Sequence, residues 1–269
     1  MNLKIQLFRL FMSLVVLSSC SNDDDNAVEP PLSIFSVDKT IVKPGDELVI
    51  TGQSLADPVV SFGIDIEDLA PGVDLDPRAE IISFTDHQLI VRVPENAVSG
   101  PIYIYSENQK AKSVIVRVQY PFLTGLLNIG EAEPTPGAVL NRDFGYEFRS
   151  AVNGKITEIG LFVQFPETYQ VSLWDVDNRL ELVSFSISST VTGNEHLNYV
   201  AIEPYSIVAN KSYRITLSRP VSTNFLFSYN EPAAYRDLNY LGAYVKDAFF
   251  PETKADRFTG IDFVFLPDL

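Results

Sequence analysis

Few residues in this 269-residue chain could act as nucleophiles, proton shuttles or soft metal ligands. The sequence holds two histidines, His87 and His196, and a single cysteine, Cys20. Both histidines lie in turn-like stretches of different halves of the chain, which predicts exposed turn residues and no shared metal site. The chain has no Gly-x-Ser-x-Gly, His-Glu-x-x-His or phosphate-binding glycine loop. We therefore expect no catalytic residue, no metal site and no cofactor, and a protein that is not an enzyme.

Acidic side chains are the remaining candidates for acid–base or metal chemistry. A glycosidase needs two facing carboxyls, and Asp175 and Asp177 beside Trp174 have the most suitable positions, although a strand running into an Asp-rich turn explains them better. A denser acidic group could supply the oxygen ligands that calcium prefers. Its spacing matches no known calcium loop, so a solvent-exposed loop is favoured and calcium binding is left open. These acids are Asp65, Glu67, Asp68, Asp74 and Asp76, within an insert at residues 64–78.

Aromatic residues carry the clearest binding signal in the sequence, with 18 Phe, 12 Tyr and one Trp. Flat aromatic faces stack on the CH-rich faces of sugars, whereas Asn, Asp and Arg side chains can fix the hydroxyls. For the tryptophan and the tyrosines, burial in a core is the alternative. A loop-rich C-terminal stretch combines both residue kinds. The predicted ligand-binding residues are Trp174, Tyr229, Tyr235, Arg236, Asn239, Tyr240 and Tyr244.

Cys20 has a different predicted role, as a site of lipid attachment. It follows two basic residues, Lys4 and Arg9, and a mostly apolar stretch at 10–17 that is shorter than the roughly 20 residues of a bilayer span. This order resembles a bacterial lipobox, whose cysteine is acylated and becomes the new N-terminus. We therefore predict a lipoprotein signal peptide at residues 1–19, a flexible acylated tether at 20–31, and membrane attachment through Cys20.

The residues after the cysteine, Ser21 to Asp25, resemble the acidic export tag of surface lipoproteins of Bacteroidetes. An ordinary solvated acidic tether is the alternative. The resemblance implies a lipid-anchored protein of the outer membrane, exposed at the cell surface, with the periplasmic face left open as the other location. The formal charge of −15 disfavours nucleic acid and anionic lipid headgroups as partners.

Short alternating runs between turn signals predict about seven strands from residue 32 to residue 118 and no convincing helix. This half resembles the IPT/TIG branch of immunoglobulin-like domains, and the acidic insert is a departure from that pattern. The resemblance implies a domain at residues 32–120. The matching segments are Pro44-Gly45, residues 48–52, residues 60–63, residues 89–94 and residues 100–105.

Prolines and glycines predict a linker at residues 121–143, although its apolar start suggests packing against one domain. Strand patterns resume at Phe144 and continue to the end, which predicts a second sandwich of jelly-roll type at 144–269. This half resembles the bacterial domain-of-unknown-function family four-zero-eight-two, which has no established catalytic residues. The matching segments are residues 145–148, 154–161, 172–174, 212–215, 250–251 and 260–265.

Together these patterns predict an all-β chain with two antiparallel β-sandwich domains in tandem, the first Ig-like and the second jelly-roll-like. The sequence has no catalytic motif, so the expected function is non-catalytic, and loops at sandwich ends are where binding residues collect. We expect a cell-envelope lipoprotein that displays a binding module for an extracellular glycan. The alternative is a structural or adhesion protein whose C-terminal domain docks another envelope protein. Its oligomeric state is not predicted.

Overall fold

The computed structural model describes residues 30–69, 76–106, 108–126, 143–162, 166–188, 197–218, 226–228, 232–246, 249–255 and 257–269. The chain divides at residues 31 and 32, and the compact unit at residues 32–269 is the one described below. The predictions for Cys20, the signal peptide, His196 and Tyr229 lie outside the described residues, as does most of the predicted linker. Within the described part of the chain, no helix is both long and apolar enough to cross a membrane.

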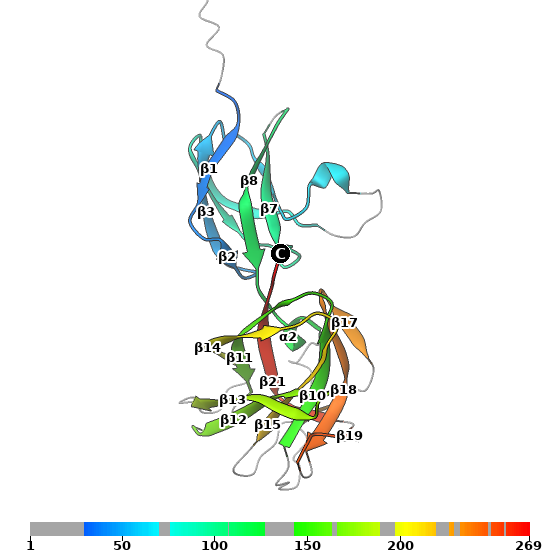
Figure 1. Cartoon of the computed structure of the whole chain (residues 1–269). Coiled ribbons are helices and arrows are strands. Elements are labelled where there is room, and N and C mark those ends of the chain that lie inside the picture. Colours follow the sequence, from blue (N-terminus) through cyan, green and yellow to red (C-terminus); the bar gives the residue numbers. More distant parts are fainter. Residues whose placement is uncertain are drawn as a thin grey trace, which may run out of the picture. The chain divides into compact units, whose positions relative to one another are not determined.

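The first half of this unit is a sandwich of two four-stranded sheets (Figure 1). One sheet has the order β1-β3-β6-β5 and the other β2-β8-β7-β4, and all neighbours are antiparallel except β2 and β8. A short 3-10 helix, η1 (Ile66–Asp68), lies in the acidic insert. The strands are β1 (Ser33–Val37), β2 (Ile41–Val42), β3 (Glu47–Gln53), β4 (Val59–Phe62), β5 (Glu80–Thr85), β6 (Gln88–Arg92), β7 (Gly100–Ser106) and β8 (Gln109–Val118).

Alternation of side chains builds the core of this sandwich. In β7, Ile102 and Ile104 are buried while Tyr103 and Tyr105 point to the other face, as the period of two in a strand requires. The inward residues of both sheets form one hydrophobic cluster with Leu48 and Phe62 among its fully buried members. The predicted strands of residues 32–118 therefore owe their stability to one shared apolar interior.

The second half is a larger sandwich. Its seven-stranded sheet has the order β13-β12-β15-β10-β18-β17, with β19 also on β18, and it faces the four-stranded sheet β14-β11-β21-β9 (Figure 1). A small pair, β16 with β20, completes it. The elements are β9 (Tyr120–Pro121), α2 (Leu123–Leu126), β10 (Asp143–Ser150), β11 (Gly154–Leu161), β12 (Thr168–Asp175), β13 (Leu180–Ser188), β14 (Asn198–Ile207), β15 (Ser212–Ser218), β16 (Leu226–Ser228), β17 (Ala233–Tyr235), β18 (Leu238–Lys246), β19 (Thr253–Ala255), β20 (Arg257–Thr259) and β21 (Ile261–Pro267).

Aromatic rings fill the space between these two sheets. Phe122, Phe148 and Phe263 are fully buried, and the ring centres of Phe148 and Phe263 lie 4.7 Å apart. Phe122 comes from the segment just after the first sandwich, so this segment is an integral part of the second core. Each large ring buries enough apolar surface to stabilise the fold by roughly 1.5–3 kcal/mol.

A buried carboxylate fixes this connecting segment to the core. Asp262 in β21 is fully buried, and its carboxylate accepts hydrogen bonds from the backbone N–H groups of Leu123, Thr124 and Phe263. The hydroxyls of Thr124 and Tyr199 donate to the same carboxylate, at 2.9 and 2.8 Å. Burial raises the pKa of Asp262 above its ordinary value, and the donors act in the opposite direction. Asp262 thus joins the connecting segment to β21 and has a structural role.

The described structure confirms the predicted all-β sandwich class. The boundaries of separate domains remain a prediction, since residues 32–269 form one compact unit that contains two large hydrophobic cores.

Candidate functional site at the junction of the two sandwiches

The predicted ligand-binding residues separate into groups with different surroundings. Tyr240 and Tyr244 were expected in a loop-rich stretch, and this expectation is wrong because both lie inside strand β18. Tyr240 points into the second core, is 0% exposed, and has its ring centre 5.9 Å from that of Tyr146. Its ring therefore has no open face. Asn239, its neighbour in the strand, is partly exposed and pairs across the sheet with Arg149.

Trp174 and Tyr244 lie on the outer face of the seven-stranded sheet. Trp174 is 2% exposed, donates its indole N–H to the hydroxyl of Thr216 at 3.0 Å, and meets the ring of Phe250 edge-on. Tyr244 is covered by the guanidinium of Arg214, 3.6 Å from its ring centre. The structure thus places both aromatics on one face, but Phe250 and Arg214 cover them.

Tyr235 and Arg236 lie at the turn between β17 and β18, where the second sandwich meets the first. Arg236 has a φ of +53°, in the left-handed region that non-glycine residues rarely adopt. Its guanidinium donates to the carbonyl oxygen of Ala97 at 2.6 Å and to that of Glu95. The guanidinium also lies 4.7 Å from the ring centre of Tyr120. These contacts fix the turn against the loop between β6 and β7.

Open space lies on both sides of this turn. One cleft of about 560 Å³ is lined by Asn96, Ser99, Tyr120, Tyr235, Arg236 and Asp237, among others. A second, of about 280 Å³, is lined by Lys43, Glu95, Thr124, Tyr199 and Tyr235, among others. Tyr235 is therefore shared by both clefts and is partly exposed.

Polar groups beside these rings are oriented by the fold. The hydroxyl of Tyr120 donates to the carboxylate of Asp237 at 3.1 Å, and burial raises the pKa of Tyr120 far above its ordinary value. Burial also raises the pKa of Tyr199 strongly, so both phenols stay protonated at physiological pH. The phenol hydrogens of Tyr120 and Tyr199 are already donated to Asp237 and Asp262. The larger cleft thus combines the ring of Tyr235 with the carboxylate acceptor of Asp237, and a polar ligand with CH-rich faces needs both kinds of contact.

Two of these lining residues were not predicted from the sequence. Tyr120 lies at the expected end of the first domain, and Tyr199 lies in an edge strand of the second sandwich. Neither sits near an aromatic cluster in the sequence, because distant strands bring them to the cleft. The Tyr-Pro pair at 120–121, placed at the junction, was the one usable signal for Tyr120.

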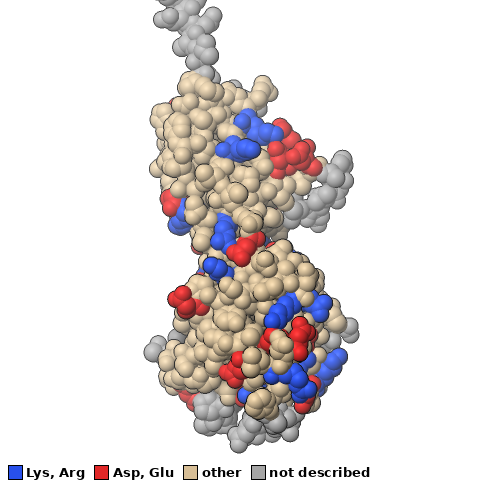
Figure 2. Space-filling model, in the orientation of Figure 1, with Lys and Arg blue, Asp and Glu red and all other residues tan. Residues whose placement is uncertain are grey.

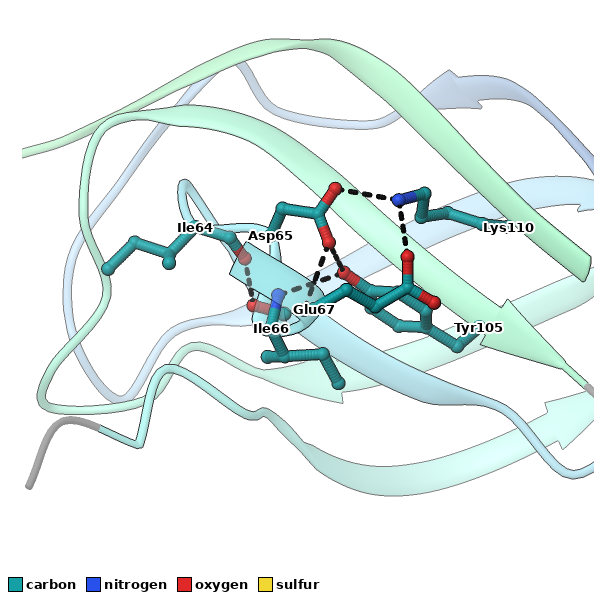
Figure 3. Close-up of polar contacts among 7 residues, drawn as sticks. Ile64, Asp65, Ile66, Glu67, Tyr105 and Lys110 are labelled. Atoms are coloured by element: carbon teal, nitrogen blue, oxygen red, sulfur yellow. Dashed lines mark hydrogen bonds and ion pairs between the residues drawn. The ribbon is translucent and has the colours of Figure 1, made fainter. Parts of the chain in front are cut away.

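Asp65 of the acidic insert lies against the outer face of β7 and β8 (Figure 3). Asp65 accepts the hydroxyl hydrogen of Tyr105 at 2.5 Å and lies 2.8 Å from the ammonium of Lys110. Lys110 also contacts Glu67 at 2.7 Å. The hydrogen bond from Lys110 lowers the pKa of Asp65. Lys110 thus offsets these two charges, and the described residues contain no group of three or more His, Cys, Asp or Glu able to hold a metal ion.

The carboxylates considered for acid–base chemistry have structural partners. Asp175 is buried, forms an ion pair with Lys211 at 2.6 Å, and accepts hydrogen bonds from the backbone N–H groups of Asp177 and Asn178. Although burial acts to raise it, the pKa of Asp175 is lowered by these partners, opposite to the raised pKa of a general acid. Asp175 therefore shapes the turn after β12.

Comparisons with known proteins leave the family open. No family model matches the sequence, and no curated protein matches it. The resemblances to IPT/TIG domains and to family four-zero-eight-two therefore stay predictions.

Several solved structures are similar to the chain at low identity. A structural genomics protein of unknown function from Bacteroides thetaiotaomicron is 12% identical, with 80% of this chain and 46% of that chain covered and a TM-score of 0.28. An auxiliary nutrient binding protein from the same species is 12% identical, with coverage of 85% and 50% and a TM-score of 0.26.

A third similar structure is SGBP-B from a complex xyloglucan utilization locus in Bacteroides uniformis. It is 9% identical, with coverage of 89% of this chain and 72% of that chain, and the TM-score is 0.25. This chain spans half or less of the length of the two Bacteroides thetaiotaomicron structures. With TM-scores below 0.5, these likenesses carry no argument about its function.

Proposed function

We propose that this protein is a non-catalytic lipoprotein of the cell envelope that binds an extracellular glycan in the clefts around Tyr235. The observation that carries the proposal is the position of Tyr235, which is partly exposed and lines both clefts beside oriented polar groups. A sugar ring needs both kinds of contact, because its axial CH groups are apolar while its rim carries hydroxyls.

Two of the predicted binding residues belong to this site. Tyr235 is assigned the stacking role, and Arg236 the role of holding the turn and bordering the larger cleft. Trp174, Tyr240 and Tyr244 are buried, so the proposal gives them structural roles. Asp237, which lines the larger cleft, joins the site as an acceptor for sugar hydroxyls, and Tyr120 orients its carboxylate.

The full chain, purified in detergent, tests the proposal by affinity electrophoresis and calorimetry against a panel of polysaccharides. The variant Y235A should weaken binding of the retained polysaccharide about tenfold, because loss of one aromatic contact costs about 1.4 kcal/mol. Y235F should keep most of the affinity, since it keeps the ring. Y103A, at a partly exposed tyrosine of β7, is the matched control and should leave binding unchanged. Equal binding by Y235A and the unmodified chain would contradict the proposal.

The proposal also places the chain at the outer membrane, exposed at the cell surface and held by lipid on Cys20. Its support is the order of the first 25 residues: basic, apolar, small, cysteine, acidic. Labelling growing cells with palmitate should mark the chain and leave C20S unmarked. Proteinase treatment of intact cells should then degrade the protein, and resistance until lysis would instead indicate the periplasmic face.

A further inference from the structure

The charges that border the two clefts indicate which glycans they can hold. We infer that the site selects neutral glycans and discriminates against those that carry carboxylate or sulfate groups. This inference rests on the proposed function and names the ligand class of the same site. Recognition of an acidic sugar needs an Arg or Lys whose hydrogen-bond donors are available to the ligand. The partners of each described cation at the junction therefore determine whether the clefts can bind an acidic sugar.

Two of these cations are paired within the protein. Lys43 lines the smaller cleft, and its ammonium lies 2.5 Å from the carboxylate of Glu158. Arg117 donates to the carbonyl oxygen of Pro267 at 2.7 Å and to the carboxylate of Asp268 at 3.0 Å. Each positive charge is therefore offset by a carboxylate of the protein, which weakens its attraction for an anionic ligand.

Arg236 is the third cation, and its contacts leave little for an anion. One terminal nitrogen donates to the carbonyl of Ala97 and the other to that of Glu95. One face of the guanidinium lies against the ring of Tyr120. End-on bidentate pairing of arginine with a carboxylate or sulfate uses one N–H of each terminal nitrogen, and here each terminal nitrogen already donates one hydrogen to a backbone carbonyl.

Negative groups border the same clefts. Glu95 is an exposed residue of the smaller cleft, and Asp237 lines the larger one beside Tyr235. The whole chain carries a formal charge of −15, and on the face shown in Figure 2 basic side chains lie beside acidic ones without a broad positive area. An anionic glycan would meet repulsion with no compensating pair.

Matched polysaccharide pairs test the selectivity, because each pair keeps a backbone and changes its charge. Suitable pairs are hydroxyethyl cellulose with carboxymethyl cellulose, methyl-esterified homogalacturonan with polygalacturonate, and arabinoxylan with glucuronoxylan. The full chain should bind the neutral member of any recognised pair at least tenfold more tightly at low salt. Added salt should reduce the difference in affinity between the two members, since it screens the repulsion of the acidic one.

A charge-reversal variant provides the second arm. E95K adds a lysine beside the smaller cleft and should raise affinity for the acidic member several-fold at low salt, while E181K, on the distant edge strand β13, should not. Tighter binding of the acidic member by the unmodified chain would overturn the inference and leave the glycan proposal standing. Failure to bind any polysaccharide would overturn both.

Discussion

In two regions of the C-terminal sandwich an arginine packs against aromatic rings, but the two arginines have different roles. On the outer sheet face, Arg214 lies over Tyr244 and pairs with Glu147 at 2.8 Å. At the junction, Arg236 lies over Tyr120 but donates to backbone carbonyls of the other sandwich. A carboxylate on the neighbouring strand allows the first arginine to be almost fully buried. The second arginine is fixed at a boundary where open space remains, and only that arrangement suits a binding site.

Breaking the buried pair should have the largest effect on stability. Arg214 and Glu147 are each 8% exposed, so R214A leaves a buried carboxylate without its cation. Loss of one partner of a buried pair costs about 3–5 kcal/mol, and urea unfolding of the variant should show a decrease of this size. The double variant R214A/E147A should recover part of the loss. A decrease below 1 kcal/mol for R214A would show that water reaches this pair.

Removing the ring that covers Trp174 should have the next largest effect. Phe250 is 5% exposed and packs edge-on against Trp174, so F250A should lower the free energy of unfolding by about 2 kcal/mol. Because the chain has a single tryptophan, its fluorescence reports on this region alone. We expect the emission of F250A to shift to longer wavelength as water reaches the indole. Y235A should leave the emission unchanged, which separates the two aromatic regions.

The turn at the junction should respond to backbone preference as well as to side-chain loss. R236A and R236G both remove the contacts to Glu95, Ala97 and Tyr120. Glycine tolerates the φ of +53° that alanine resists, so R236G should be more stable than R236A by about 1 kcal/mol. Thermal unfolding of the pair measures the difference. Equal stability would mean that the turn changes conformation once the guanidinium is gone.

The sequence predicts the strands well because their signal is local. Alternation marks β7, and the apolar run at 263–266 marks β21, which is buried along its whole length. The face on which a given tyrosine lies is less predictable. Tyr240 and Tyr244 are four residues apart, a spacing that should place both on one face. A bulge between them, where the register with β10 shifts, turns Tyr240 inward and Tyr244 outward.

The clefts could not be predicted from the sequence because their walls come from distant segments. Tyr199 and Tyr235 are contributed by different sheets, and Glu95 and Asn96 by a loop of the first sandwich. Composition showed that aromatic and polar residues were available for sugar binding. Which of them border open space depends on strand pairings such as β9 with β21, which carries Tyr120 into the second sandwich.

The ion pair between Asp65 and Lys110 is more exposed than either arginine site, and its loss should have the smallest effect on stability. Asp65 pairs with Lys110, whose side chain is 39% exposed, so solvent screens the pair far more than the Arg214 pair. The hydrogen bond from Lys110, followed by that from Tyr105, lowers the pKa of Asp65 in the folded protein. A lowered folded pKa contributes stability above the unfolded value of about 3.9, and this contribution is lost as pH falls toward the folded pKa.

The variant D65N should therefore be slightly less stable than the unmodified chain at pH 6, and the two should converge as the pH falls below 4. Urea unfolding at several pH values between 6 and 2.5 measures the convergence. D86N, at an exposed turn acid, is the matched control and should follow the unmodified chain throughout. If the free energy of unfolding of D65N followed that of the unmodified chain in parallel over this pH range, ionisation of Asp65 would contribute nothing to stability. The contact of Asp65 with Tyr105 would then account for how the insert is held on the sheet.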